Sequence, residues 1–174
     1  MAKIYLIRHA ETEPTGDDGT LWPLSERGEE QVKQLAAQPF WDEVKAIISS
    51  PAPKAIATVH PIAVERNIPI HAHDGLRELR RTKERLADYD ARVIEVFQRP
   101  ALSVGGWERA ADAQRRMLTT LEELIQKFDG APFAVASHGM ALALLLASLQ
   151  NAMGYAYEIW QDLGFASVTL IERE

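Results

Sequence analysis

The sequence has 174 residues, a length that suits one domain with an ordinary hydrophobic core. Hydrophobic residues make up 47% and charged residues 25%, a composition typical of a globular protein that excludes a disordered or fibrous chain. The formal net charge of -6 disfavours nucleic acid and anionic membrane surfaces as partners.

The chain contains no cysteine, which excludes disulfides and thiolate chemistry and fits the reducing cytoplasm. No signal peptide is expected, because the first apolar run is brief and leads directly to Arg8. The longest apolar stretch, Met140 to Leu149, is well short of the roughly 20 residues that a helical membrane span needs. We therefore expect a cytoplasmic protein without a membrane or nucleic-acid partner; the oligomeric state stays open.

The first predicted element is a buried strand over Ile4 to Ile7. It ends in Arg8 and His9, two groups that are costly to bury without a partner. We expect them to face a cleft where an anion can pair with them. The next stretch, residues 13–23, contains two prolines and two glycines and is predicted to be a loop over the strand end.

A helix is predicted from Glu26 to Ala37, with Ser25 as its N-cap and Val32 and Leu35 facing inward. A second apolar run, Val44 to Ser50, predicts another strand.

The chain then passes through Pro51 into a predicted helix from about Pro53 to Glu65, with Lys54 in its first turn. Ile68 to Ile70 is a short third run of strand character.

Residues 77–109 differ in character, because they mix many charges of both signs with a Gly105-Gly106 pair and Trp107. One interpretation is a solvated helix followed by a loop. The other is an excursion over the functional site whose charges meet the substrate. Both interpretations can hold for different residues.

Helical spacing returns from Ala110 to Phe128, and Phe133 to Ser137 predicts a further strand. This strand leads through His138 into the apolar segment Met140 to Leu149, which we expect to be a buried helix. The run from Ser167 to Ile171 is predicted to be an edge strand.

This alternation of strands and helices predicts one α/β domain over residues 1–174, a three-layer α/β/α sandwich with a mostly parallel sheet. Three of its strand-to-helix junctions carry Arg8 with His9, Lys54, and His138. Ligands of such sheets bind outside the carboxyl ends of the strands, where helix N-termini also favour phosphate. The sequence therefore predicts an anion site at this edge.

Four ordered segments carry a family resemblance: LIRHAET from residue 6, LSERGEEQ from residue 24, SSPAPKAIAT from residue 49 and SHGM from residue 137. In order and spacing they resemble the phosphoglycerate mutase-like branch of the histidine phosphatase superfamily. The resemblance implies a metal-independent phosphomonoester hydrolase, with no cofactor, that works through a phosphohistidine.

On this resemblance, His9 is the nucleophile, Arg8 and Gly139 bind phosphate, and His138 donates to a phosphate oxygen in the transition state. Glu78 is the expected proton donor to the leaving alkoxide. Two other glutamates are reserves for that role: Glu108, and Glu11, which we expect to brace the loop.

The sequence departs from the family pattern at two positions. Lys54 stands where relatives usually carry arginine, so the positive charge stays but the bidentate fork is lost. Arg81 is another cation that could contribute. Thr15 stands where mutase-like relatives, with RHGESxWN, often have an asparagine that contacts phosphate. This difference and the short chain favour hydrolysis over mutase transfer. Lys54 and Thr15 are still expected to bind phosphate, Thr15 through its one hydroxyl.

His71 and His73 lie on one face of a predicted strand with Asp74 next, but no third metal ligand is evident and the resemblance needs none. The expected partner is a small phosphorylated metabolite or a phosphoprotein. The alternatives are a catalytically weakened phosphate-binding protein, a phosphohistidine-protein phosphatase favoured by a shallow site, and a phosphoglycerate mutase.

Overall fold

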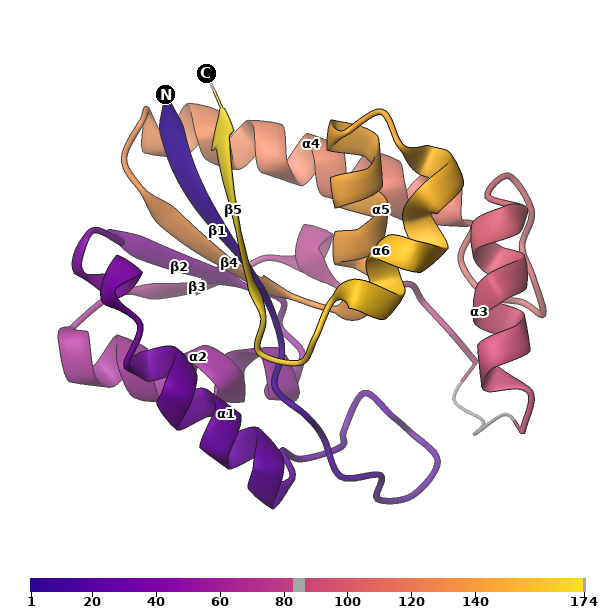
Figure 1. The fold of residues 1–174 in the computed structure, drawn as a ribbon, viewed down its shortest axis with the longest axis horizontal. Helices are drawn as coiled ribbons and strands as arrows, with labels where there is room; N and C mark the ends of the chain where they lie inside the picture. The colour runs from indigo at the N-terminus through magenta and orange to yellow at the C-terminus, as the bar shows by residue number, and fades with distance from the viewer. Residues whose placement is uncertain (83–86, 174) are drawn as a thin grey trace.

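The computed structural model describes residues 1–82 and 87–173, and within them the chain forms a five-stranded sheet in the order β3-β2-β4-β1-β5 (Figure 1). The strands are β1 (Ala2–Arg8), β2 (Ala46–Ser49), β3 (Ile70–Ala72), β4 (Phe133–Ser137) and β5 (Val168–Arg173). The first four strands pair in parallel, and β5 pairs antiparallel with β1 at one edge. The predicted mostly parallel sheet and its final edge strand are confirmed.

The described α-helices are α1 (Glu26–Ala36), α2 (Pro53–Arg66), α3 (Tyr89–Gln98), α4 (Ala110–Phe128), α5 (Gly139–Leu149) and α6 (Ala156–Asp162), and the described 3-10 helices are Pro39–Asp42, Asp74–Leu76 and Met153–Tyr155. α1, α2, α4 and α5 match the predicted segments closely, whereas α3 lies within residues 77–109, for which no helix bounds were predicted, and α6 was not predicted. The unanticipated helix, α6, has seven residues and no side-chain cap, so it leaves little local signal.

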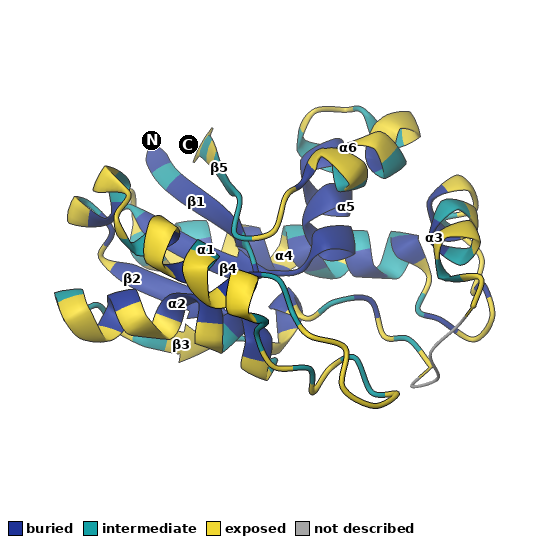
Figure 2. Cartoon of the chain, turned by 60° about the horizontal axis from the view of Figure 1, so that its bottom comes forward, coloured by how far each residue is buried: buried dark blue, intermediate teal, exposed yellow. Residues whose placement is uncertain are grey.

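Helices cover both faces of the sheet (Figures 1 and 2). On β1, Tyr5 and Ile7 point toward the layer of α1 and α2, whereas Ile4 and Leu6 point toward the layer that contains α4, α5 and α6. Because both faces are buried, the central strands are apolar along their whole length instead of alternating. This is the predicted three-layer arrangement.

α5 is apolar on every side because it is enclosed between the sheet, α4 and α6, and Figure 2 shows it buried along its length. Its leucines Leu142, Leu144 and Leu145 are at most 1% exposed. Burying each contributes about 1.5–3 kcal/mol relative to an exposed side chain. A rigid α5 gives its N-terminus, next to His138, a fixed position.

The start of α1 is tied to the chain that leaves β1. Ser25 caps the helix by accepting the N–H of Gly28 at 3.0 Å, as predicted. The backbone of Gly28 passes so close to Glu11 that an added Cβ would lie 2.1 Å from its carbonyl oxygen, which only glycine permits. Both ends of the loop over residues 13–23 are thereby anchored.

The carboxyl ends of β1, β2 and β4 meet at one edge of the sheet. The Ser137 carbonyl accepts the N–H of His9 at 3.0 Å, and the Ala136 carbonyl accepts the N–H of Ser50 at 2.8 Å. Three strand-to-helix junctions therefore lie side by side. Within the described ranges, none of the helices has the length and apolar character to cross a membrane.

Candidate active site

A cavity of about 790 Å³ lies at this edge. Its walls come from the three strand-to-helix junctions, from the loop over residues 13–23 and from the α6–β5 connection. They also include the segment after β3, residues 77–109, which is called the excursion below. Its lining residues are Arg8, His9, Thr12, Pro14, Asp17, Asp18, Gly19, Thr20, Leu21, Trp22, Ser50, Pro51, Ala52, Pro53, Lys54, Arg77, Glu78, Leu79, Arg81, Thr82, Tyr89, Trp107, His138, Gly139, Trp160 and Phe165. Residues 83–86 of the excursion, which include the charged Lys83, Glu84 and Arg85, lie outside the described residues.

His9 is buried at the floor of the cavity, with 6% of its surface exposed. Its Nδ1 lies 2.8 Å from the Ala10 carbonyl oxygen, which can only accept, so Nδ1 carries the proton. Burial, followed by the neighbouring His138, lowers the pKa of His9 to about 3. The ring is therefore neutral near pH 7, and its Nε2 keeps a free lone pair.

His138 lies beside His9, with ring centroids 5.2 Å apart. Its Nε2 and the Ser50 hydroxyl form a 2.8 Å hydrogen bond, whereas its Nδ1 is buried with no partner in the described part of the chain. Burial, then the charges of Lys54 and Arg81, hold the pKa of His138 well below its usual value. Two neutral imidazoles thus share one pocket. Ser50 was not predicted as a site residue, although it stands in the SSP segment that carries the resemblance.

Arg8 reaches across the carboxyl end of β1 toward the α6–β5 connection. Its Nη1 donates to the Leu163 carbonyl, and its guanidinium lies 4.1 Å from the centroid of the Phe165 ring. Its Nε is buried without a hydrogen-bond partner among the described residues, and burial lowers the pKa of Arg8. The guanidinium is held in place while retaining an unused donor.

Lys54 is 7% exposed, and its Nζ donates to the Gly19 carbonyl at 2.7 Å. This bond fastens the loop over residues 13–23 to the first turn of α2. Burial, followed by the charge of Arg81, lowers the pKa of Lys54 to about 8. Its ammonium is thus a loop anchor as well as a cation of the cavity.

Arg81 brings a third cation to the cavity from the excursion. Its Nη1 donates to the Tyr89 hydroxyl at 2.6 Å, and its guanidinium lies 5.5 Å from the Tyr89 ring and 5.6 Å from the Trp107 ring. Stacking between two rings orients the guanidinium plane.

Glu78 lies at the N-terminus of α5. Its carboxylate accepts the N–H of Met140 at 3.1 Å, of Ala141 at 2.9 Å and of its own neighbour Leu79 at 3.0 Å. These bonds place a carboxylate in the lining of the cavity, which the cations also line.

An ion pair behind the cavity clamps the chain on both sides of Glu78. The guanidinium of Arg116, on α4, donates to the carbonyls of Gly75 and Arg77, both at 2.8 Å. It also pairs with Glu108 at 3.0 Å, and Glu108 accepts the N–H of Arg80 at 2.9 Å. The backbone around Glu78 is therefore held by charged hydrogen bonds, which are about twice as strong as neutral ones.

Most of the residues singled out in the sequence line the cavity: Arg8, His9, Lys54, Glu78, Arg81, His138 and Gly139. A Cβ on Gly139 would lie 3.0 Å from both the Arg8 guanidinium and the Trp160 indole nitrogen, so a larger residue there would require these side chains to shift by a few tenths of an ångström. Thr15 is exposed and is not among the lining residues. The neighbouring Thr12 and Asp18 line the cavity instead.

The reserve glutamates have structural partners. Glu11 accepts the Ser25 hydroxyl at 2.8 Å, which braces the loop, and Glu108 is held by Arg116. The Nδ1 of His73 accepts the N–H of Gly75, and its Nε2 lies 3.8 Å from Glu123. Across residues 1–82 and 87–173, no three His, Cys, Asp or Glu side chains form a cluster that could hold a metal ion.

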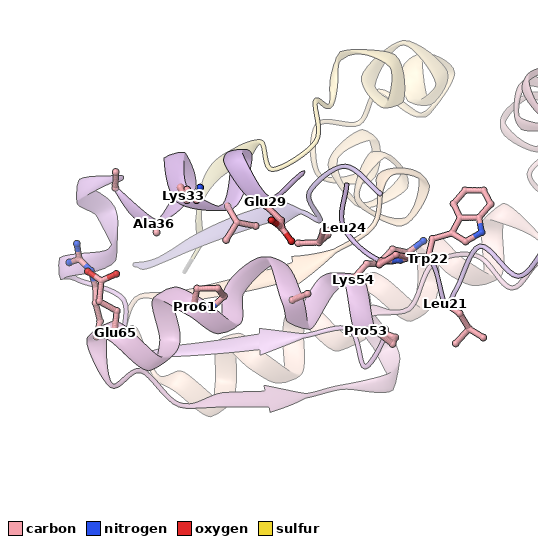
Figure 3. Close-up of a pocket in the computed structure, with 15 residues that line it drawn as sticks. Leu21, Trp22, Leu24, Glu29, Lys33, Ala36, Pro53, Lys54, Pro61 and Glu65 are labelled. Atoms are coloured by element: carbon pink, nitrogen blue, oxygen red, sulfur yellow. The ribbon is translucent and has the colours of Figure 1, made fainter. Parts of the chain in front are cut away.

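A second cavity, of about 990 Å³, lies between α1 and α2 (Figure 3). It shares Leu21, Trp22, Pro53 and Lys54 with the first. The other lining residues are Pro23, Leu24, Glu29, Val32, Lys33, Ala36, Ala37, Ala57, Pro61, Glu65 and Arg66. No histidine lines it, whereas the imidazoles of His9 and His138 both line the cavity at the sheet edge, which is therefore the candidate active site.

Comparison with known proteins agrees with this geometry. The family model for the histidine phosphatase superfamily (branch 1) matches residues 4–174. Phosphoserine phosphatase 1 of Hydrogenobacter thermophilus is 29% identical over 161 residues, which cover 86% of this chain and 76% of that protein.

Solved structures are similar over the whole chain. The Bacillus stearothermophilus protein YhfR superposes with a TM-score of 0.84 at 26% identity, over 100% of this chain and 92% of that one. A mycobacterial glucosyl-3-phosphoglycerate phosphatase superposes with a TM-score of 0.80 at 22% identity, over 99% and 90% of the two chains. The chain belongs to the histidine phosphatase superfamily, branch 1, and its enzyme class is that of a phosphatase.

Proposed function

We propose that this protein hydrolyses phosphomonoesters through a phosphohistidine formed on Nε2 of His9. The observation that carries the proposal is the convergence of the two neutral imidazoles, the cations of Arg8, Lys54 and Arg81, and the Glu78 carboxylate around a single cavity. A dianionic phosphate would meet the guanidinium groups of Arg8 and Arg81 and the ammonium of Lys54. Charge-assisted hydrogen bonds of this kind are the strong ones.

In the first step, the Nε2 lone pair attacks phosphorus and the ester P–O bond breaks, while Glu78 in its protonated form gives its proton to the leaving alkoxide. In the second step, Glu78 takes a proton from water, whose oxygen attacks phosphorus and breaks the P–N bond to release phosphate. Covalent catalysis divides one difficult displacement into two easier ones. The hydrogen bond from Nδ1 to the Ala10 carbonyl keeps Nε2 available throughout.

The unpartnered polar atoms support the phosphate role of the site. If Ser50 donates to Nε2 of His138, the buried Nδ1 of that ring carries a proton for a phosphate oxygen. The unpartnered Nε of Arg8 is a second donor. Such preorganised donors act where charge develops in the transition state.

A small phosphorylated metabolite is favoured over a phosphoprotein as substrate, because loops surround the cavity and a buried nucleophile lies at its floor. A weakened phosphate-binding protein is the second candidate. It is favoured by Lys54, whose ammonium already binds the Gly19 carbonyl. A cytoplasmic location, one domain over residues 1–174 and independence of cofactors stay predictions.

The test is phosphate release from 4-nitrophenyl phosphate in the presence of a metal chelator, by the wild type, by His9→Ala and by His60→Ala. His60 is an exposed histidine on α2 and is the matched control. We expect chelator-resistant turnover that is lost in His9→Ala and retained in His60→Ala, with an acid-labile phosphoenzyme in the wild type. Full activity in His9→Ala would disprove the mechanism, and phosphate binding without turnover in the wild type would favour the second candidate.

A further inference from the structure

Tryptophan is concentrated at the catalytic cavity. The chain has four tryptophans, and three of them, Trp22, Trp107 and Trp160, line this one cavity. They come from the loop after β1, the end of the excursion and α6, so no local repeat explains their convergence. The fourth, Trp41, is packed in the core beneath α1 and α2.

Other apolar side chains line the same cavity, and together with the three tryptophans they are called its apolar wall below. Tyr89 and Leu79 line the cavity from the excursion. Leu21 is 67% exposed and Phe165 is 36% exposed, which places two of the exposed large hydrophobic residues of the described chain at this cavity. Covering such side chains is worth about 25 cal/mol per Å² of apolar surface removed from water. The wall therefore suits an apolar group.

The same wall disfavours a charged group on the alcohol. A carboxylate or a second phosphate that lay against these apolar side chains would lose part of its hydration without gaining a partner from them, which is costly. Asp17 and Asp18 line the cavity from the loop and Arg77 lines it from residues 77–109, so the lining charges are of both signs.

From this wall we infer that the natural substrate is the phosphate monoester of an uncharged, apolar alcohol, such as an aromatic or branched one. The inference rests on the proposed function. It places the phosphate at His9 and the alcohol against Trp22, Trp160 and Phe165. It also separates this chain from relatives named for phosphoserine and glucosyl-3-phosphoglycerate, whose alcohols are polar or charged.

The test compares 2-phenylethyl phosphate with O-phosphoserine and 3-phosphoglycerate as substrates. All are esters of alkyl alcohols, so differences in kcat/KM report chiefly how the alcohol is bound. We expect kcat/KM for 2-phenylethyl phosphate to exceed both others by at least about tenfold, the scale of a discriminating apolar pocket. Equal or better turnover of either charged substrate would overturn the inference.

A matched pair of variants locates the effect. Leu21 lines the cavity, whereas Val64, on α2, lines neither described cavity, and each is 67% exposed. We expect Leu21→Ser, but not Val64→Ser, to lower the ratio of kcat/KM for 2-phenylethyl phosphate to that for methyl phosphate by about threefold, or about 0.7 kcal/mol. Equal ratios in the two variants would contradict the assignment of this wall.

The outcomes for the two proposals are distinguishable. Loss of 4-nitrophenyl phosphate turnover in His9→Ala tests the phosphohistidine mechanism whatever the natural alcohol. If that loss is observed but phosphoserine is preferred, the inference about the alcohol fails and the proposed function stands. If His9→Ala retains full activity, the mechanism fails first.

Discussion

The proposed phosphate end and the proposed alcohol end of the cavity are built from different parts of the chain. At the proposed phosphate end, Arg8 ends β1, His9 and His138 directly follow β1 and β4, and Lys54 lies in the first turn of α2. At the alcohol end, the apolar wall comes from the loop over residues 13–23, the excursion and the α6–β5 connection. Strand ends cannot shift without disturbing the core, whereas loops can change independently. The comparison suggests a shared reaction at one end and a variable substrate at the other.

Glu78 is the proposed proton donor to the bond between phosphate and alcohol, and replacing it has the largest expected effect. We expect Glu78→Gln to lower kcat/KM for an alkyl phosphate by about 10²–10⁴-fold, because a poor leaving group needs a proton. The loss in kcat/KM with 4-nitrophenyl phosphate should be much smaller, since nitrophenolate leaves unprotonated and kcat/KM reports only the steps up to phosphoryl transfer. Steady-state kinetics with both substrates check this; equal losses in kcat/KM would assign Glu78 to binding instead of protonation of the leaving group.

Replacing Arg81 tests whether a residue of the excursion binds the phosphate group. We expect Arg81→Ala to raise KM for phosphate esters and to lower kcat/KM by about 10–100-fold, the scale of a lost charged hydrogen bond.

Because Lys54 lacks a guanidinium fork, Lys54→Arg should recover part of this loss in the double variant. A double-mutant cycle measures the coupling. Strict additivity would show that Arg81 does not compensate for Lys54.

The pH profile sharpens the role of Lys54. Its pKa is lowered to about 8, so its positive charge is present below pH 8 and is lost as the pH rises through that value. We expect kcat/KM to fall above about pH 8, by up to about tenfold per pH unit where Lys54 deprotonation limits phosphate binding.

Lys54→Arg should remove this alkaline limb, whereas Lys45→Arg, at an exposed position, should leave it in place. An unchanged limb in Lys54→Arg would assign it to another group.

Replacing Arg116, which holds the backbone around Glu78, has the smallest expected effect. Arg116→Lys removes the fork that holds the carbonyls of Gly75 and Arg77, so Glu78 should be less well aligned. We expect kcat/KM for alkyl phosphates to fall by about fivefold, and by less for 4-nitrophenyl phosphate, on the scale of one charged hydrogen bond partly lost. Thermal unfolding is the control: a lower Tm with equal losses on both substrates would indicate a purely structural role.

Sequence alone determined the fold class, the boundaries of most strands and helices, and the residues with which the strand ends line the cavity; the roles of these residues stay predictions. These features are local: an apolar run predicts a strand, an N-cap predicts a helix start, and the residues between them must lie at the strand end. The positions of α1, α4 and β4 differ from the predicted segments by at most one residue.

Only the tertiary structure brings together the side chains of the proposed alcohol end. Trp22, Trp107, Trp160 and Phe165 are far apart in the sequence, and no periodicity relates them. The tertiary structure also leaves Thr15 exposed outside the cavity and places the Ser50 hydroxyl within hydrogen-bond distance of His138. The path of a loop depends on many weak long-range contacts, such as the bond from Lys54 to the Gly19 carbonyl, which a local pattern does not encode.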